Sequence, residues 1–126
     1  LAAQQPANAD MSPDFRLVSS SVRREGNSVV LDLLWQPLAA SGPYDLYVHL
    51  LDSSGKQTAQ SDVLARPPDD GPTSGYLLLT EHTLVAPPGN YRAEAGVAHR
   101  SVEHPEQVVG GAIGQAARLP LTVPAG

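Results

Sequence analysis

Residues 44–62 read YDLYVHLLDSSGKQTAQSD, and this stretch decides the fold class. Leu46, Val48 and Leu50 alternate with other residues at the two-residue period of a half-buried strand. Residues 52–55, Asp-Ser-Ser-Gly, then supply turn chemistry, and a second, more polar run follows the turn. The stretch therefore predicts a β-hairpin with one face directed towards a core.

The same alternation recurs along the chain and gives five further strand candidates. The clearest runs from Ser28 to Gln36, and the others span residues 15–22, 76–85, 91–99 and 115–123. Because side chains of a strand point alternately to its two faces, each candidate has a set that faces a core. We expect these residues to face inward: Val29, Leu31, Leu33, Trp35, Leu46, Val48, Leu50, Tyr91, Ala93, Ala95, Val97, Leu119 and Leu121.

Turn-forming residues separate these candidates and leave little room for helix. The chain has 12 prolines and 11 glycines, a punctuation at intervals of about ten residues that is typical of short strands in a sandwich or barrel. Residues 66–73 contain three prolines and predict a loop that no helix crosses. Residues 102–113 also predict mostly loop. The predicted fold is all-β: an immunoglobulin-like antiparallel β-sandwich of seven to eight strands.

A proline-rich turn before Tyr91 is the strongest marker of that architecture. Residues 87–91, Pro-Pro-Gly-Asn-Tyr, resemble the tyrosine corner of immunoglobulin-like sandwiches, in which the hydroxyl bonds to upstream backbone and the ring enters the core. Trp35 on an early core strand fits the same layout. The alternative is that both rings are core aromatics of another β-fold.

The length of 126 residues predicts one domain. We assign it to residues 14–124 and expect residues 1–13, rich in Ala, Gln, Asn and Pro, to be a linker or disordered lead-in. Because the chain opens with Leu1, we expect a mature secreted protein or one domain of a longer chain. The expected location is extracytoplasmic, secreted or at the cell surface, as part of a larger membrane-anchored protein.

Charge and composition narrow the classes of partner. Eight basic and 13 acidic residues give a net charge of −5, which argues against nucleic acid as a partner. The basic pair Arg23-Arg24 is interpreted as a solvated turn. The absence of cysteine excludes disulfides and thiolate metal sites. No apolar run approaches the roughly 20 residues of a membrane span, so we expect no direct membrane insertion.

Several short motifs occur in the order and at the spacing of a known family. They are residues 48–52 (VHLLD), Gly55, residues 59–62 (AQSD), 71–74 (GPTS), 82–84 (HTL) and 87–91 (PPGNY). Over residues 29–98 the chain resembles the immunoglobulin-like C-terminal domain of bacterial, Chloroflexi-like membrane proteins of the dolichyl-phosphate-mannose-type glycosyltransferase family, a module also found in related surface proteins. The resemblance implies a domain with no established catalytic residues. Residues 99–114 depart from the family pattern, so a specialised contact would be sought there.

The remaining candidate chemistry is sparse. Imidazoles suit zinc or copper, but of the four histidines only His99 and His104 are close in sequence, and His49 and His82 belong to strands expected in different sheets. Glu81 precedes His82 on a strand, so their side chains point to opposite faces and cannot act together. No serine nucleophile motif is present. We therefore expect neither catalysis nor a metal or other cofactor, with a fold-back of the 99–104 loop onto His49 left as the open alternative.

The expected function is that of a non-catalytic extracytoplasmic accessory domain, which positions or interacts with a neighbouring domain of its own chain or a protein partner. The alternative is a carbohydrate-binding module of a cell-surface or secreted protein. An aromatic platform for sugar could be supplied by Tyr44, Tyr47, Tyr76 and His49, although only 5% of the residues are aromatic. The candidate binding surface consists of Tyr47, His49, Tyr76, His99 and His104.

Overall fold

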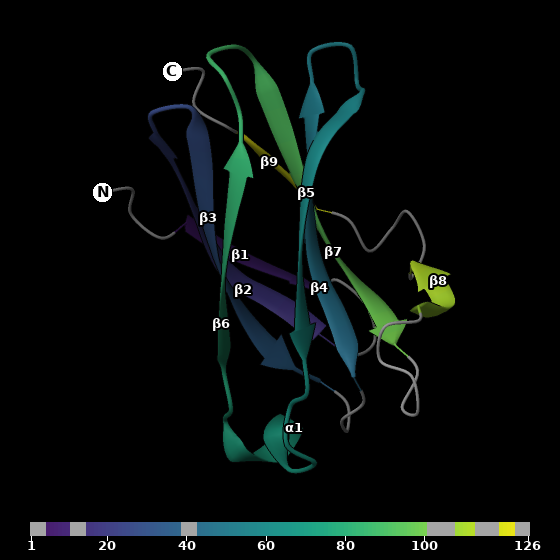
Figure 1. Ribbon diagram of the computed structural model, residues 1–126. Coiled ribbons are helices and arrows are strands. Elements are labelled where there is room, and N and C mark those ends of the chain that lie inside the picture. The colour runs from purple at the N-terminus through teal and green to yellow at the C-terminus, as the bar shows by residue number, and fades with distance from the viewer. Residues whose placement is uncertain (1–4, 11–14, 39–42, 101–107, 113–118, 123–126) are drawn as a thin grey trace.

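The computed structural model describes residues 5–10, 15–38, 43–100, 108–112 and 119–122, and these are nearly all strand (Figure 1). Within them lie nine strands and one short helix, α1 (Gly71–Ser74). The strands are β1 (Gln5–Asp10), β2 (Phe15–Glu25), β3 (Ser28–Pro37), β4 (Tyr44–Asp52), β5 (Gln57–Ala65), β6 (Leu78–Val85), β7 (Tyr91–Arg100), β8 (Val108–Ala112) and β9 (Leu119–Thr122).

The strands form two antiparallel sheets. Sheet A has the order β1-β2-β3-β6, and sheet B has the order β5-β4-β7-β8, with β9 also paired to β7. The end strands β5 and β6 contact each other, and α1 lies in the connection between them (Figure 1). Among the described residues no helix has the length and apolarity of a membrane span. The all-β antiparallel sandwich predicted from the sequence is confirmed.

The β4–β5 hairpin forms where residues 44–62 predicted it, and Asp52 closes its turn. A carboxylate oxygen of Asp52 accepts hydrogen bonds from the backbone N–H of Ser54 (2.9 Å), the Ser54 hydroxyl (2.6 Å) and the backbone N–H of Lys56 (3.0 Å). These bonds, with the Ser54 hydroxyl foremost, lower the pKa of Asp52. Gly55 has φ +87°, a left-handed conformation that glycine adopts without steric cost. The turn chemistry therefore fixes the register of the two strands.

The core lies between the two sheets and contains the alternating residues expected from the sequence. Tyr91, also predicted to face inward, is half-buried. The other predicted core residues of β3, β4 and β7 are fully buried: Val29, Leu31, Leu33, Trp35, Leu46, Val48, Leu50, Ala93, Ala95 and Val97. Leu119 and Leu121 pair through their backbones with Ala95 and Ala93, and their side chains lie outside the described part. Phe15 adds edge-on ring contacts to Trp35 (centroids 6.2 Å apart) and Tyr44 (4.9 Å). The core is thus a continuous apolar layer with one aromatic cluster.

The expectation that residues 1–13 form a linker or disordered lead-in is wrong for residues 5–10. These residues form β1, which pairs antiparallel with β2 from Gln5 opposite Ser20 to Asp10 opposite Arg16. The segment has no apolar alternation that would predict a strand. Its backbone is stabilised by the hydrogen-bonding edge of the following strand, β2, and such pairing does not require apolar alternation in the added strand.

Two segments interpreted as loops also hold regular structure. Within the proline-rich loop, residues 71–74 form α1, which tolerates Pro72 because proline fits the first turn of a helix. The helix ends at Gly75, whose φ is +77°. Residues 108–112, in the segment expected to be mostly loop, form β8 at the edge of β7. Together with β1, β8 raises the strand number above the seven to eight predicted.

Tyr91 contributes less than the predicted tyrosine corner requires. Its ring is half-buried and packs against the periphery of the core, at the start of β7. Among the described residues its hydroxyl has no hydrogen-bond partner. Residues 87–91 therefore predicted the start of β7 correctly, but the hydroxyl of Tyr91 does not form the hydrogen bond of a tyrosine corner within the described part of the chain.

The facing of β3 can be tested by truncating its two leucines. Leu33 is fully buried and Leu34, the next residue, is half-buried on the outer face. We expect Leu33→Ala to lower the free energy of unfolding by about 2–5 kcal/mol, through lost burial and the cavity left behind. Leu34→Ala should cost clearly less. Chemical denaturation measures both, and equal losses would show that the two faces are assigned wrongly.

Candidate interaction surface

Tyr47 and His49, two residues of the predicted binding surface, lie on the outer face of β4. Their rings stack with centroids 4.6 Å apart and an interplanar angle of 29°. The Tyr47 ring also lies on Gly96 of β7, so closely that a Cβ at that position would collide with it. Tyr47 is only 3% exposed, and its hydroxyl has no hydrogen-bond partner among the described residues. The ring therefore packs onto the sheet and is not presented to solvent.

The structure holds no exposed aromatic platform. All six aromatic residues of the chain fall within the described ranges, so each can be placed. Tyr76, between α1 and β6, is half-buried and makes no ring contact or hydrogen bond with a described residue. Tyr47 and His49 therefore come together and Tyr76 does not join them. The buried rings are Phe15, Trp35, Tyr44 and Tyr47, and the half-buried ones are Tyr76 and Tyr91.

The two remaining candidates lie at or beyond the limit of the described residues. The backbone of His99 belongs to β7 and pairs with Tyr44, while His104 lies outside the described residues. Among the residues that are described, no group of three potential ligands could hold a metal ion. His49 lies in sheet B and His82 in sheet A, as their strands predicted.

His82 is the buried polar group that sequence reasoning passed over. It is fully buried on the inner face of β6, and Glu81 before it is exposed, as predicted for neighbours on a strand. Its Nε2 lies 2.9 Å from Oγ1 of Thr80, which also accepts a 2.9 Å hydrogen bond from the indole N–H of Trp35. Its Nδ1 lies 3.0 Å from Oγ of Ser61 in β5. A buried chain of hydrogen bonds therefore runs from sheet A to sheet B.

A neutral imidazole satisfies this chain. The indole N–H of Trp35 can only donate, so the Thr80 oxygen accepts it and the Thr80 hydroxyl proton is available to the His82 ring. A protonated ring would donate from both nitrogens. The Thr80 oxygen would then accept twice, and its own proton would lose this partner. The network thus favours the uncharged ring.

The surroundings of His82 also favour the uncharged form of its ring. Burial lowers the pKa of its imidazole below the ordinary value of 6.5. A hydrogen bond with Ser61 and the carboxylates of Asp62 and Asp32 oppose this effect but are smaller. The burial of His82 could have been predicted from the alternation along β6, because Thr80 and His82 lie on the same face of the strand as the buried Leu84.

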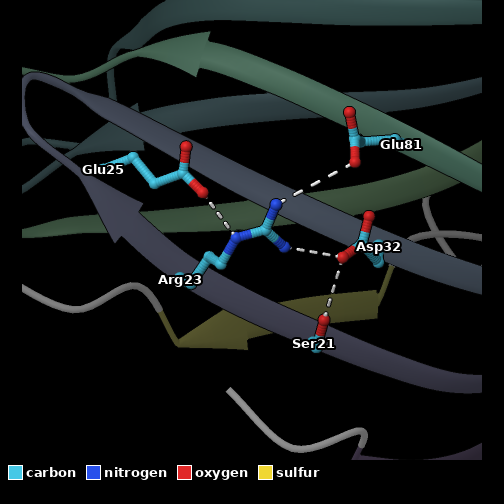
Figure 2. Close-up of polar contacts among 5 residues, drawn as sticks. All are labelled: Ser21, Arg23, Glu25, Asp32 and Glu81. Carbon is cyan, nitrogen blue, oxygen red and sulfur yellow. Dashed lines mark hydrogen bonds and ion pairs between the residues drawn. The ribbon is translucent and has the colours of Figure 1, made fainter. Parts of the chain in front are cut away.

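An ion cluster around Arg23 occupies the outer face of sheet A (Figure 2). The guanidinium lies 2.7 Å from Asp32 of β3, 2.7 Å from Glu25 and 3.9 Å from Glu81 of β6. Hydrogen bonds to Glu25, foremost, and to Asp32 raise the pKa of Arg23. The cluster spans three strands and contains three acidic groups and one basic group. Arg23 therefore lies in β2 and not in the solvated turn predicted for it, while the turn itself follows at Gly26.

Exposed apolar side chains lie beside this cluster. Leu79 of β6 is 60% exposed and pairs in register with Leu34 of β3, which is half-buried on the same outer face. Leu77 and Val85, before and at the end of β6, are also exposed. We call the outer-face set Arg23, Asp32, Leu34, Leu79 and Glu81 the A face. It combines apolar contact area with fixed charges, as protein interfaces do.

The comparisons with known proteins bear on the fold alone. No protein-family model matches the sequence, and no curated protein matches it either. A solved structure of a Bacteroides fragilis protein, provisionally assigned as a β-galactosidase, aligns with 95% of this chain at a TM-score of 0.50 and 12% identity. The aligned region is 17% of that longer chain. A likeness at this identity indicates a shared β-sandwich architecture, here within a small part of a larger protein.

The stability of the fold should depend on pH through His82. The lowered pKa means that the folded protein binds the proton less readily than the unfolded chain, whose histidine titrates near 6.5. The free energy of unfolding is therefore highest above about pH 6.5 and decreases as the pH falls towards the lowered folded-state pKa. Denaturant unfolding between pH 7.5 and 5 measures this. His82→Gln should remove the decrease, whereas His49→Gln should retain it, and a loss in both variants would contradict the assignment.

Tyr47 gives a second test, which separates a packing role from a binding role. Its hydroxyl is buried without a partner among the described residues, so its removal breaks no bond there. We expect Tyr47→Phe to leave the stability unchanged or to raise it by up to about 1 kcal/mol. Thermal and chemical unfolding provide the measurement. A loss of more than about 1 kcal/mol would instead show that the hydroxyl has a partner in the folded protein.

Proposed function

We propose that this chain is a non-catalytic, extracytoplasmic accessory domain that binds a neighbouring domain of its own chain, or a protein partner, through the A face. The observation that carries the proposal is the pairing of Leu34 and Leu79 beside the Arg23 ion cluster. Exposed apolar residues next to fixed charges are a common mark of an interaction site.

The distribution of chemical groups supports a role without catalysis. The carboxylates of the A face, Asp32 and Glu81, lie in ion pairs with Arg23. The His82 ring is fully buried, and its two nitrogens contact the hydroxyls of Ser61 and Thr80, so it is not accessible as a base. The likeness to a small part of a longer protein supports a domain that serves a larger chain. From the resemblance over residues 29–98, we propose a membrane-bound, glycosyltransferase-type neighbour.

The alternative function, carbohydrate binding, has one observation in its favour: the structurally similar protein carries a β-galactosidase assignment. The side chains of this chain favour it less. Sugar-binding faces present aromatic rings to solvent, and here Tyr44 and Tyr47 are buried and Tyr76 is half-buried. Protein recognition through the A face is therefore the stronger proposal.

Titration calorimetry against the separately expressed neighbouring domains of the full-length protein tests this role. We expect binding that Leu34→Lys weakens at least tenfold, about 1.4 kcal/mol, because a charge replaces an apolar contact at the centre of the A face. Leu64→Lys, at an exposed leucine of sheet B, is the matched control and should bind normally.

Two results would contradict the proposal. Binding of a glycan on an array, with none to the neighbouring domains, would support the carbohydrate-binding alternative. Hydrolysis of aryl glycosides by the purified domain would show that the chain is an enzyme.

A further inference from the structure

Strand β6 ends sheet A with an apolar edge. Among the described strands it pairs only with β3 (Figure 1). Its solvent-facing residues are Leu79, Glu81, Thr83 and Val85, of which Val85 is 70% exposed. An end strand with exposed apolar side chains can act as a template for pairing with another strand. The outer part of β6 is therefore a candidate site for such pairing.

Strand β5, the end strand of sheet B next to β6, differs. The solvent-facing side of β5 carries Gln60 and Asp62, and hydrogen bonds join Gln57 to Gln60 (2.8 Å) and Gln60 to Asp62 (3.0 Å). Leu64 is the exposed large apolar residue of this strand. Polar and charged side chains along an edge discourage pairing with another chain. Of the two neighbouring end strands, β6 therefore presents more exposed large apolar side chains than β5.

We propose that β6 pairs antiparallel with β6 of a second copy of this chain, about a two-fold axis at His82. The inference rests on the proposed interaction role and assigns a partner to this edge of the A face. In this register Leu79 lies opposite Val85 of the second copy, and Glu81 lies opposite Thr83 of the second copy. Apolar residues meet apolar residues and no carboxylate faces another, which is the favourable pattern for cross-strand pairs.

Neighbouring registers fit less well. Moving the two-fold axis by one residue shifts each pairing by two residues, so the solvent-facing side chains of both strands still lie on the same face. These registers are therefore the alternatives to the one proposed. An axis at Glu81 places the two Glu81 carboxylates opposite each other. An axis at Thr83 places Glu81 opposite Val85. The axis at His82 avoids both mismatches.

The charges near the edge are compatible with this pairing. Each Glu81 already lies 3.9 Å from the guanidinium of Arg23 in its own chain, which offsets the approach of a second carboxylate. The two copies of sheet A would then form one continuous sheet in the order β1-β2-β3-β6-β6-β3-β2-β1. The two A faces would lie on the same side of this sheet.

Sedimentation equilibrium of the purified chain tests the pairing. We expect a monomer–dimer equilibrium at concentrations up to roughly 1 mM, where even weak pairing is populated. Leu79→Lys/Val85→Lys places two lysines opposite each other at both ends of the strand pair, and should raise the dissociation constant at least about tenfold. Leu64→Lys, on β5, is the matched control and should leave the dissociation constant unchanged. Circular dichroism confirms that each variant is folded.

A charge-swap variant tests the register. Leu79→Lys/Val85→Glu should dimerise at least about tenfold more tightly than the double-lysine variant, because lysine would then face glutamate across the two-fold axis. A wild-type chain that stays monomeric at every concentration would overturn the proposal, as would a dimer that resists the double-lysine change. Failure of the charge swap to restore pairing would overturn the register.

These results are separable from the proposed function. Leu34 lies on β3, away from the strand edge, so Leu34→Lys should weaken binding of the neighbouring domains but not dimerisation. A chain that is monomeric and still binds those domains would reject self-pairing, keep the accessory role, and leave the β6 edge to a strand of another protein.

Discussion

A buried chain of hydrogen bonds, from Trp35 through Thr80 and His82 to Ser61, joins the two sheets of this sandwich. Apolar contacts between the sheets supply most of the stabilising free energy, but they are non-directional and tolerate small displacements. The hydrogen bonds have defined lengths and angles, and a buried polar group left without its partner costs about 1–3 kcal/mol. The chain therefore fixes how β6 lies relative to β5, at the open side of the sandwich.

The sequence predicted those parts of the fold that depend on local pattern. Alternating apolar residues placed β3, β4 and β7 and their inward faces, and the carboxylate of Asp52 formed the expected turn. β1 and β8 were missed because their stabilisation comes from the backbone edges of β2 and β7. Pairing with a backbone edge, even that of the neighbouring strand in the sequence, requires no side-chain pattern in the strand that is added. Apolar alternation and backbone pairing thus account for different strands.

The candidate surface was less predictable because the burial and charge pairing of its residues depend on other strands. The stacking of Tyr47 on His49 follows from their spacing on one strand. The burial of Tyr47 does not, since it depends on Gly96 in β7, far away in the sequence. Likewise, Arg23 appeared to belong to a turn because its partners Asp32 and Glu81 come from other strands. Which charges are solvated and which are paired is decided by strand order.

The end strands β5 and β6 lie next to each other and expose different side chains, and His82 of β6 bonds to Ser61 of β5. On β5 the polar side chains bond one another, so the edge is closed chemically. On β6 the inner face is held by the bond from His82 to Ser61, while the outer face exposes Leu79 and Val85. Pairing of two β6 strands about His82 would bring the two imidazoles opposite each other on the inner face. Two protonated rings there would repel each other, whereas burial disfavours the charged ring by removing it from water, so the two effects favour the neutral ring for different reasons. The uncharged form of His82 is therefore compatible both with the hydrogen bonds between the sheets and with the proposed pairing of β6.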